Sequence, residues 1–168
     1  TRKIFSFDIS AGCSGFIYAL KVARALIENG EAEKLLVVGG EHLSHITDYK
    51  DRDTCILFGD AAGAVVLEKS QEPGVLSVCL GSSGAEGKLL YVPGGGSRDP
   101  LGYRFLKMEG KEVFKEAVKI IESNSLEAIK KAGLRPKDID MFIYNIRICQ
   151  NIFKIILIIL IYFSHGDL

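Results

Sequence analysis

The sequence lacks an excess charge of either sign, closely spaced cysteines and a long hydrophobic run. Its 168 residues carry 21 lysines and arginines against 21 aspartates and glutamates. The overall charge therefore gives no reason to expect nucleic acid or an anionic membrane surface as a partner. Cys13, Cys55, Cys79 and Cys149 lie far apart, unlike the close pairs of zinc and thioredoxin-like sites. We expect reduced thiols and no metal site.

No segment has the length of a membrane anchor or of a signal peptide. The apolar run at residues 155–163 is nine residues long, whereas a helix needs ~18 or more to cross a bilayer. We expect no membrane segment and a cytoplasmic location, with a plastid as the alternative if a transit peptide has been lost. The first residues read as the inside of a β-strand, so we expect the chain to start within a domain.

Up to about residue 143, strand-like and helix-like patterns alternate, which is typical of a layered α/β domain. Apolar spacing predicts helices over residues 13–28 and 108–132, with Asn29-Gly30 and Gly133 as their stops. Strands are expected at residues 4–9 (buried), 35–38, 61–67, 75–80, 89–92 and 139–143. Polar loops are expected at residues 41–54 and 93–100.

The composition changes abruptly after residue 143. Of the last 25 residues, 15 are Ile, Phe, Tyr, Asn or Lys, all of which have A/T-rich codons, and alanine is absent. We interpret residues 1–143 as a partial domain and residues 144–168 as an aberrant tail translated from an intron or a shifted reading frame. Sequencing the transcript across this junction would decide between these origins.

Cys13 is the strongest candidate for a reactive residue. It lies where the strand-like residues 4–9 give way to a helix, a position whose free N–H groups and dipole favour a thiolate. The small neighbours Ala11, Gly12 and Ser14 allow an acyl thioester to approach the backbone, and the Cys13 N–H is a candidate oxyanion donor. The alternative is that Cys13 is an ordinary buried cysteine, which these properties alone do not exclude.

Four segments in order resemble one enzyme family. Asp8-Ile-Ser-Ala-Gly-Cys-Ser-Gly-Phe16 is similar to the active-site motif of β-ketoacyl-acyl-carrier-protein synthase III. The resemblance continues through the loop at residues 39–54, the turn and strand at residues 58–67 and the helix at residues 108–118. It implies a thiolase-like layered α-β-α-β-α fold, incomplete here because the family's N-terminal part and most of its C-terminal half have no counterpart.

The resemblance also implies roles for particular residues. Cys13 would carry the acyl group, and Arg52 would contact the nucleotide end of coenzyme A, as a guanidinium can pair with phosphate and stack on a base. Phe58, Gly110 and Phe114 occupy positions that the family uses for substrate binding. The alternatives are a solvated Arg52 and plain core packing for Phe114.

The family's catalytic histidine and asparagine find no match. After the expected strand at residues 139–143 the chain has Tyr144-Asn-Ile-Arg-Ile148 where the family has Pro-His-Gln-Ala-Asn. In the complete enzyme, the resemblance implies, the cysteine takes an acyl group from acyl-coenzyme A and decarboxylated malonyl-acyl carrier protein attacks it. Without the donors that stabilise the enolate, we expect acylation of Cys13 to remain and condensation to be severely impaired.

The resemblance implies acyl-coenzyme A and acyl carrier protein as partners, a homodimer, and no cofactor beyond the two substrates. A basic stripe recurs every four residues at Lys111, Lys115 and Lys119. It either binds the acidic surface of acyl carrier protein or is simply a solvated helix face. Two other functions stay open. One is a polyketide or alkylquinolone starter synthase, and the other is a non-catalytic half-synthase that acts as an interaction protein.

Overall fold

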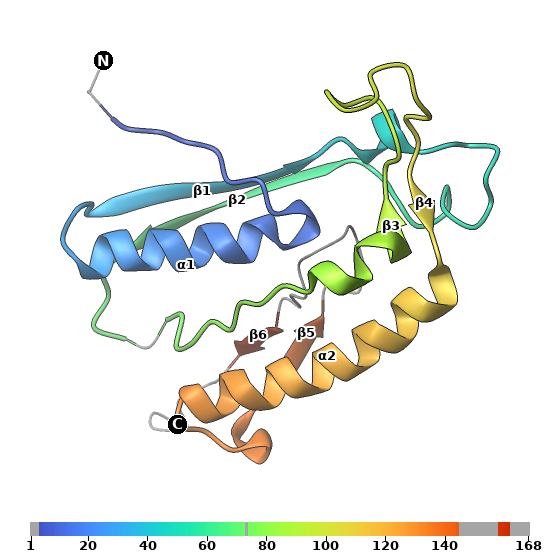
Figure 1. Ribbon diagram of the computed structural model, residues 1–168. Coiled ribbons are helices and arrows are strands. Elements are labelled where there is room, and N and C mark those ends of the chain that lie inside the picture. Colours follow the sequence, from blue (N-terminus) through green and yellow to red (C-terminus); the bar gives the residue numbers. More distant parts are fainter. Residues whose placement is uncertain (1–3, 73, 145–157, 162–168) are drawn as a thin grey trace.

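The computed structural model describes residues 4–72, 74–144 and 158–161 (Figure 1). Among these residues the helices are α1 (Gly15–Glu28) and α2 (Gly110–Lys131), and four 3-10 turns accompany them: η1 (Gly12–Ser14), η2 (Leu43–Ile46), η3 (Gly84–Leu89) and η4 (Pro136–Asp138). The strands are β1 (Lys34–Glu41), β2 (Ala61–Glu68), β3 (Leu90–Tyr91), β4 (Lys107–Met108), β5 (Met141–Tyr144) and β6 (Ile158–Ile161). In the described part of the chain they pair as three antiparallel ribbons, β1–β2, β3–β4 and β5–β6.

The longest ribbon, β1–β2, is covered by α1 on one face only. Val37 lies on the covered face and is buried, and a Cβ at Gly39 would stand 3.3 Å from the Phe16 ring of α1. Leu36 and Val66 are paired on the opposite face, and each is about two-thirds exposed, at 66% and 65%. The strands expected at residues 35–38 and 61–67 are confirmed, and each extends to eight residues.

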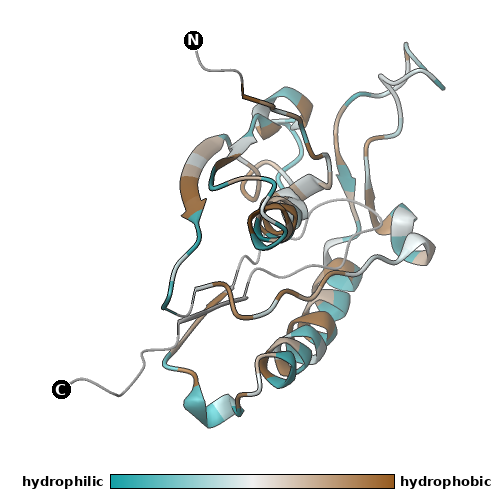
Figure 2. Cartoon of the chain, turned by 90° about the vertical axis from the view of Figure 1, so that its left-hand side faces the viewer, coloured by the Kyte–Doolittle hydropathy of each residue, from teal (hydrophilic) through white to brown (hydrophobic). Residues whose placement is uncertain are grey.

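Both expected helices are confirmed. α1 buries Ile17 and Ala23, and the chain leaves it through Gly30, whose positive φ of 77° suits a residue without a Cβ. Along α2, hydrophobic and hydrophilic residues alternate from turn to turn (Figure 2). The buried side of α2 carries Val113 and Ile129, and the helix ends before Gly133, with a φ of 74°.

A small core joins the loop after β1 to the start of α2. Leu43, Phe58, Leu90, Leu106 and Val113 form a buried cluster. They come from η2, the segment before β2, the β3–β4 hairpin and the first turn of α2. This cluster holds the expected polar loop at residues 41–54 beside the start of β4, since Leu106 N donates to Ile46 O at 2.8 Å.

Two expected strands are wrong. Residues 4–9 are extended but lie outside any strand, and Ile4 is 84% exposed instead of buried, because no neighbouring strand pairs with this segment. Residues 75–80 also form no strand. The segment is hydrogen-bonded to helices instead: Arg24 of α1 donates to Leu76 O at 3.0 Å, and the Ser77 hydroxyl donates to Ala128 O of α2 at 2.7 Å.

The other two expected strands are shifted or shortened. The strand expected at residues 89–92 is reduced to β3, and the one expected at residues 139–143 is β5, Met141–Tyr144. β5 pairs with β6, which falls within the region 144–168 that we interpret as an aberrant tail. Residues 145–157 and 162–168 lie outside the described part, so the domain boundary at residue 143 stays a prediction.

Candidate functional site

Cys13 lies in η1, the 3-10 turn that runs directly into α1. Gly12 enters this turn with a φ of 55°, a left-handed conformation that favours glycine. Ser14 N donates to Ala11 O at 3.2 Å, and both of these neighbours are buried, whereas Cys13 is half-buried. The thiol is therefore placed at the start of a helix, where the backbone N–H groups and the helix dipole favour negative charge.

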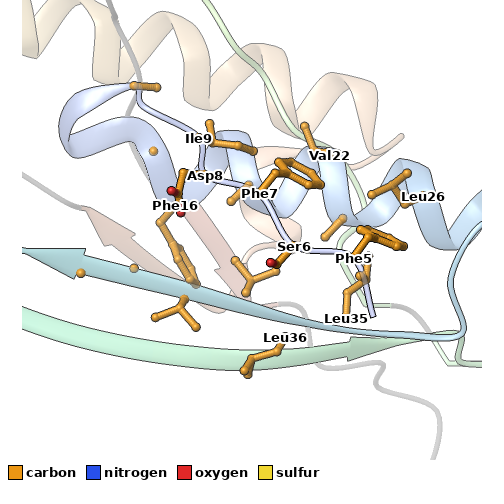
Figure 3. Close-up of a pocket in the computed structure, with 18 of the residues that line it drawn as sticks. Phe5, Ser6, Phe7, Asp8, Ile9, Phe16, Val22, Leu26, Leu35 and Leu36 are labelled. Carbon is orange, nitrogen blue, oxygen red and sulfur yellow. The ribbon is translucent and has the colours of Figure 1, made fainter. Parts of the chain in front are cut away.

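A cleft of about 1230 Å³ lies next to this turn, between residues 4–12, α1 and β1 (Figure 3). Phe5 and Phe7 stack with ring centroids 6.4 Å apart, and Figure 3 shows both rings on the side of the segment that faces Val22 and Leu26 of α1. The lining reaches Gly12 but does not include Cys13. The cleft exists because the extended segment stands off β1 instead of pairing with it.

Arg52 lies in a turn whose neighbours are held by hydrogen bonds. The Asp51 carboxylate accepts from the Thr54 hydroxyl at 2.8 Å and from Asp53 N at 3.0 Å. The Thr54 side chain is buried, whereas Arg52 is exposed. Among the described residues the Arg52 guanidinium has no ion-pair partner. The turn is ordered, and its cation is open to an anionic ligand.

The remaining residues assigned by resemblance lie around the small core. Phe58 is buried within it, Gly110 begins α2, and Phe114 is 59% exposed one residue after the buried Val113. A core position for Phe58 agrees with a structural role, and the exposure of Phe114 argues against plain core packing. Their contacts with substrate stay predictions.

No local sequence pattern predicted the polar group around Asp60. Its carboxylate accepts from Ser44 N at 2.8 Å and from the Ser44 hydroxyl at 2.6 Å, and His42 Nε2 lies 3.9 Å away. These hydrogen bonds from Ser44 lower the pKa of Asp60, and His42 adds a smaller effect. Asp60 thus ties η2 to the start of β2. No cluster of three or more His, Cys, Asp or Glu side chains in the described part is arranged to hold a metal ion.

The fold brings most of these residues toward one end of the molecule. In Figure 1 the start of α1, the loop between β1 and β2, and the start of α2 all lie toward the same side. The loop and α2 share the core cluster through Phe58 and Val113. Cys13 is linked to them through α1, whose Phe16 faces Gly39 near the end of β1.

The part of the chain that carries Cys13 and the β1–β2 ribbon is similar to a known family. Residues 7–84, which include Cys13, Arg52 and Phe58, match the family described as 3-oxoacyl-[acyl-carrier-protein] synthase III. Over these residues the chain is similar to that family. The synonym β-ketoacyl-[acyl-carrier-protein] synthase III names the same enzyme.

Individual relatives support the assignment. The β-ketoacyl-[acyl-carrier-protein] synthase III of Caldanaerobacter subterraneus is 48% identical over 146 residues, which cover 82% of this chain and 44% of the relative. The synthase III structure from Thermus thermophilus has a TM-score of 0.73 at 48% identity and covers 81% of this chain and 44% of that one. This confirms the incomplete thiolase-like fold. The chain spans less than half the length of these relatives.

A second solved structure bears on specificity. The priming β-ketosynthase of the R1128 polyketide biosynthetic pathway is 35% identical, with a TM-score of 0.68, and covers 79% of this chain and 41% of that one. The fold is thus shared between a β-ketoacyl-[acyl-carrier-protein] synthase III and a polyketide priming synthase. No helix among the described residues is long and apolar enough to cross a membrane.

Proposed function

We propose that this chain carries the acyl-accepting part of a β-ketoacyl-acyl-carrier-protein synthase III, an acyltransferase that starts fatty-acid chains. The observation that supports it is the position of Cys13, on a turn continuous with α1 and inside the matched residues 7–84. The Cys13 thiolate attacks the thioester carbonyl of an acyl-coenzyme A. The acyl group passes to sulfur, and coenzyme A leaves as a thiolate that takes up a proton.

The second half-reaction needs groups that we do not find in residues 1–168. Decarboxylation of malonyl-acyl carrier protein produces an enolate whose oxygen must be stabilised by hydrogen-bond donors. The family uses a histidine and an asparagine for this purpose, and neither motif is present in the sequence. We propose that this chain accepts an acyl group and condenses it poorly.

The proposed partners follow from the surface of α2 and from the family. Lys115 and Lys119 form ion pairs with Glu112 and Glu116, both at 2.7 Å and on the exposed side of the helix. Such exposed pairs contribute little stability and exchange readily with another anion. We propose this face, with Lys111, as the approach for acyl carrier protein. A homodimer and a cytoplasmic location complete the proposal.

Acylation of the intact chain tests the proposal. We expect acetyl-coenzyme A to add one acetyl group, detected by the mass of the intact protein, and Cys13→Ala to abolish it. Cys55→Ala is the matched control, because Cys55 is also a half-buried free thiol but does not begin a helix. Acetylation that persists in Cys13→Ala, or iodoacetamide labelling of Cys13 no faster than that of Cys55, would contradict the assignment.

The likeness to the polyketide priming synthase favours a second candidate, a starter synthase with another acyl preference. The same assay separates the two candidates when acetyl-coenzyme A is compared with longer and branched acyl-coenzyme A donors. Preference for acetyl supports the fatty-acid role. Preference for a longer or branched acyl group supports the starter synthase.

A further inference from the structure

The loop that carries Arg52 is attached to a second loop from the distant β3–β4 hairpin. The Tyr103 hydroxyl donates to Asp48 Oδ2 at 3.0 Å across 55 positions of sequence. A backbone hydrogen bond from Leu106 N to Ile46 O, at 2.8 Å, runs beside it. Leu106 is almost wholly buried in the small core, so the core holds the two loops together at this point.

The Tyr103 ring is held in place by its own neighbours. It meets Phe105 edge to face, with ring centroids 5.5 Å apart, and Lys107 Nζ lies 5.1 Å from the ring centroid. Edge-to-face and cation–π contacts both favour one ring orientation. The hydroxyl is therefore presented to Asp48 from a fixed direction, although the side chain is partly exposed.

Asp48 connects the fixed Tyr103 hydroxyl to the turn at residues 48–54. Its carboxylate also accepts from Lys50 N at 2.9 Å, and the carbonyl of Asp51 accepts from Cys55 N at 2.9 Å. The Asp51 carboxylate closes the turn by binding Thr54. Arg52 directly follows Asp51, the second of these two anchored carboxylates, and its guanidinium makes no hydrogen bond to another described residue.

We propose that Tyr103 is a positioning residue: through Asp48 it holds the turn at residues 48–54 so that Arg52 meets the nucleotide end of coenzyme A. The inference rests on the proposed function, because it requires coenzyme A as the ligand. A turn that is already ordered loses less conformational entropy when a ligand binds, so the hydrogen bond contributes to affinity without touching the ligand.

The test compares donors with and without the nucleotide, using the full 168-residue chain. The rate of Cys13 acetylation is measured against the concentration of acetyl-coenzyme A and of S-acetylpantetheine, which lacks the nucleotide. Tyr103→Phe removes only the hydroxyl and keeps the ring contacts. The matched control is Tyr49→Phe, because Tyr49 lies in the same loop and its hydroxyl makes no hydrogen bond to another described residue.

We expect Tyr103→Phe to raise the half-saturating concentration of acetyl-coenzyme A about fivefold, the effect of one ordinary hydrogen bond. The maximal rate, the reaction with S-acetylpantetheine and the behaviour of Tyr49→Phe should stay unchanged. An unchanged response to acetyl-coenzyme A overturns the inference. Equal losses with both donors also overturn it, since they indicate a general effect on folding.

Direct binding of coenzyme A, measured by calorimetry, separates this inference from the proposed function. If coenzyme A binds but Cys13 is not acetylated, the proposed function fails, and weaker binding to Tyr103→Phe still supports the role of Tyr103. If coenzyme A does not bind the unaltered chain, the inference is overturned, because the turn at residues 48–54 then binds no nucleotide.

Discussion

Asp60 connects two segments that lie 16 positions apart, η2 and the start of β2, through its hydrogen bonds to Ser44. Because these bonds favour the charged carboxylate, the pKa of Asp60 is lower in the folded chain than its ordinary value. Folding therefore gains stability from Asp60 above its ordinary pKa and loses that stability as the pH falls through the lowered value.

We predict that Asp60→Asn lowers the midpoint of urea unfolding at about pH 6. The difference in midpoint between the variant and the unaltered chain should shrink toward about pH 2. Asp53→Asn is the control, because the Asp53 side chain makes no hydrogen bond to another described residue. A difference between Asp60→Asn and the unaltered chain that is the same at both pH values would show that charge on Asp60 does not contribute.

At the scale of elements, α2 is stabilised on one side only. Ile129 is 2% exposed, whereas Leu126, three residues earlier, is 51% exposed. We predict that Ile129→Ala lowers the free energy of unfolding by about 2–5 kcal/mol, because it leaves a cavity. Leu126→Ala should cost less than about 1 kcal/mol. Urea unfolding followed by circular dichroism measures both free energies. Equal losses of stability in the two variants would contradict the buried position of Ile129.

The hairpin that presents Tyr103 depends on a close approach of its two sides. A Cβ at Gly94 would stand 2.5 Å from the carbonyl carbon of Gly102, whereas at Gly96 it would meet nothing within 4 Å. We predict that Gly94→Ala costs about 1–3 kcal/mol of stability, because the backbones must separate. Gly96→Ala should stay within about 0.5 kcal/mol. Thermal unfolding of the two variants compares them directly.

At the scale of the whole molecule, no helix or strand of the described residues covers one face of the β1–β2 ribbon. Leu36, Val38 and Val66 are exposed there, on the side away from α1. A soluble monomer rarely exposes a contiguous apolar face of this kind. The face and the unpaired strand edges favour association between copies.

We predict that the 168-residue chain is poorly soluble and forms concentration-dependent assemblies in size-exclusion chromatography with light scattering. The pair Leu36→Lys with Val66→Glu, which places opposite charges across the ribbon, should reduce assembly. Leu101→Lys is the control, since Leu101 is exposed on a loop far from this face in sequence. A cooperative, monomeric melt of the unaltered chain would contradict the prediction.

The sequence alone determined the helices and the setting of Cys13. Apolar spacing and the glycines at positions 30 and 133 are local signals, because a helix makes its hydrogen bonds within its own segment. The motif around Cys13 therefore predicted a thiol at a helix start, and the structure places it there. Its role as the acyl carrier stays a prediction.

Only the tertiary structure decided which extended segments become strands and which side chains hold the Arg52 turn. Residues 4–9 and 75–80 have strand-like composition, but a strand needs a partner that is distant in sequence, and none pairs with them in the described part of the chain. The bond between Tyr103 and Asp48 joins positions 55 residues apart. No local pattern encodes such a contact, because it exists only once the core around Leu106 has brought the two loops together.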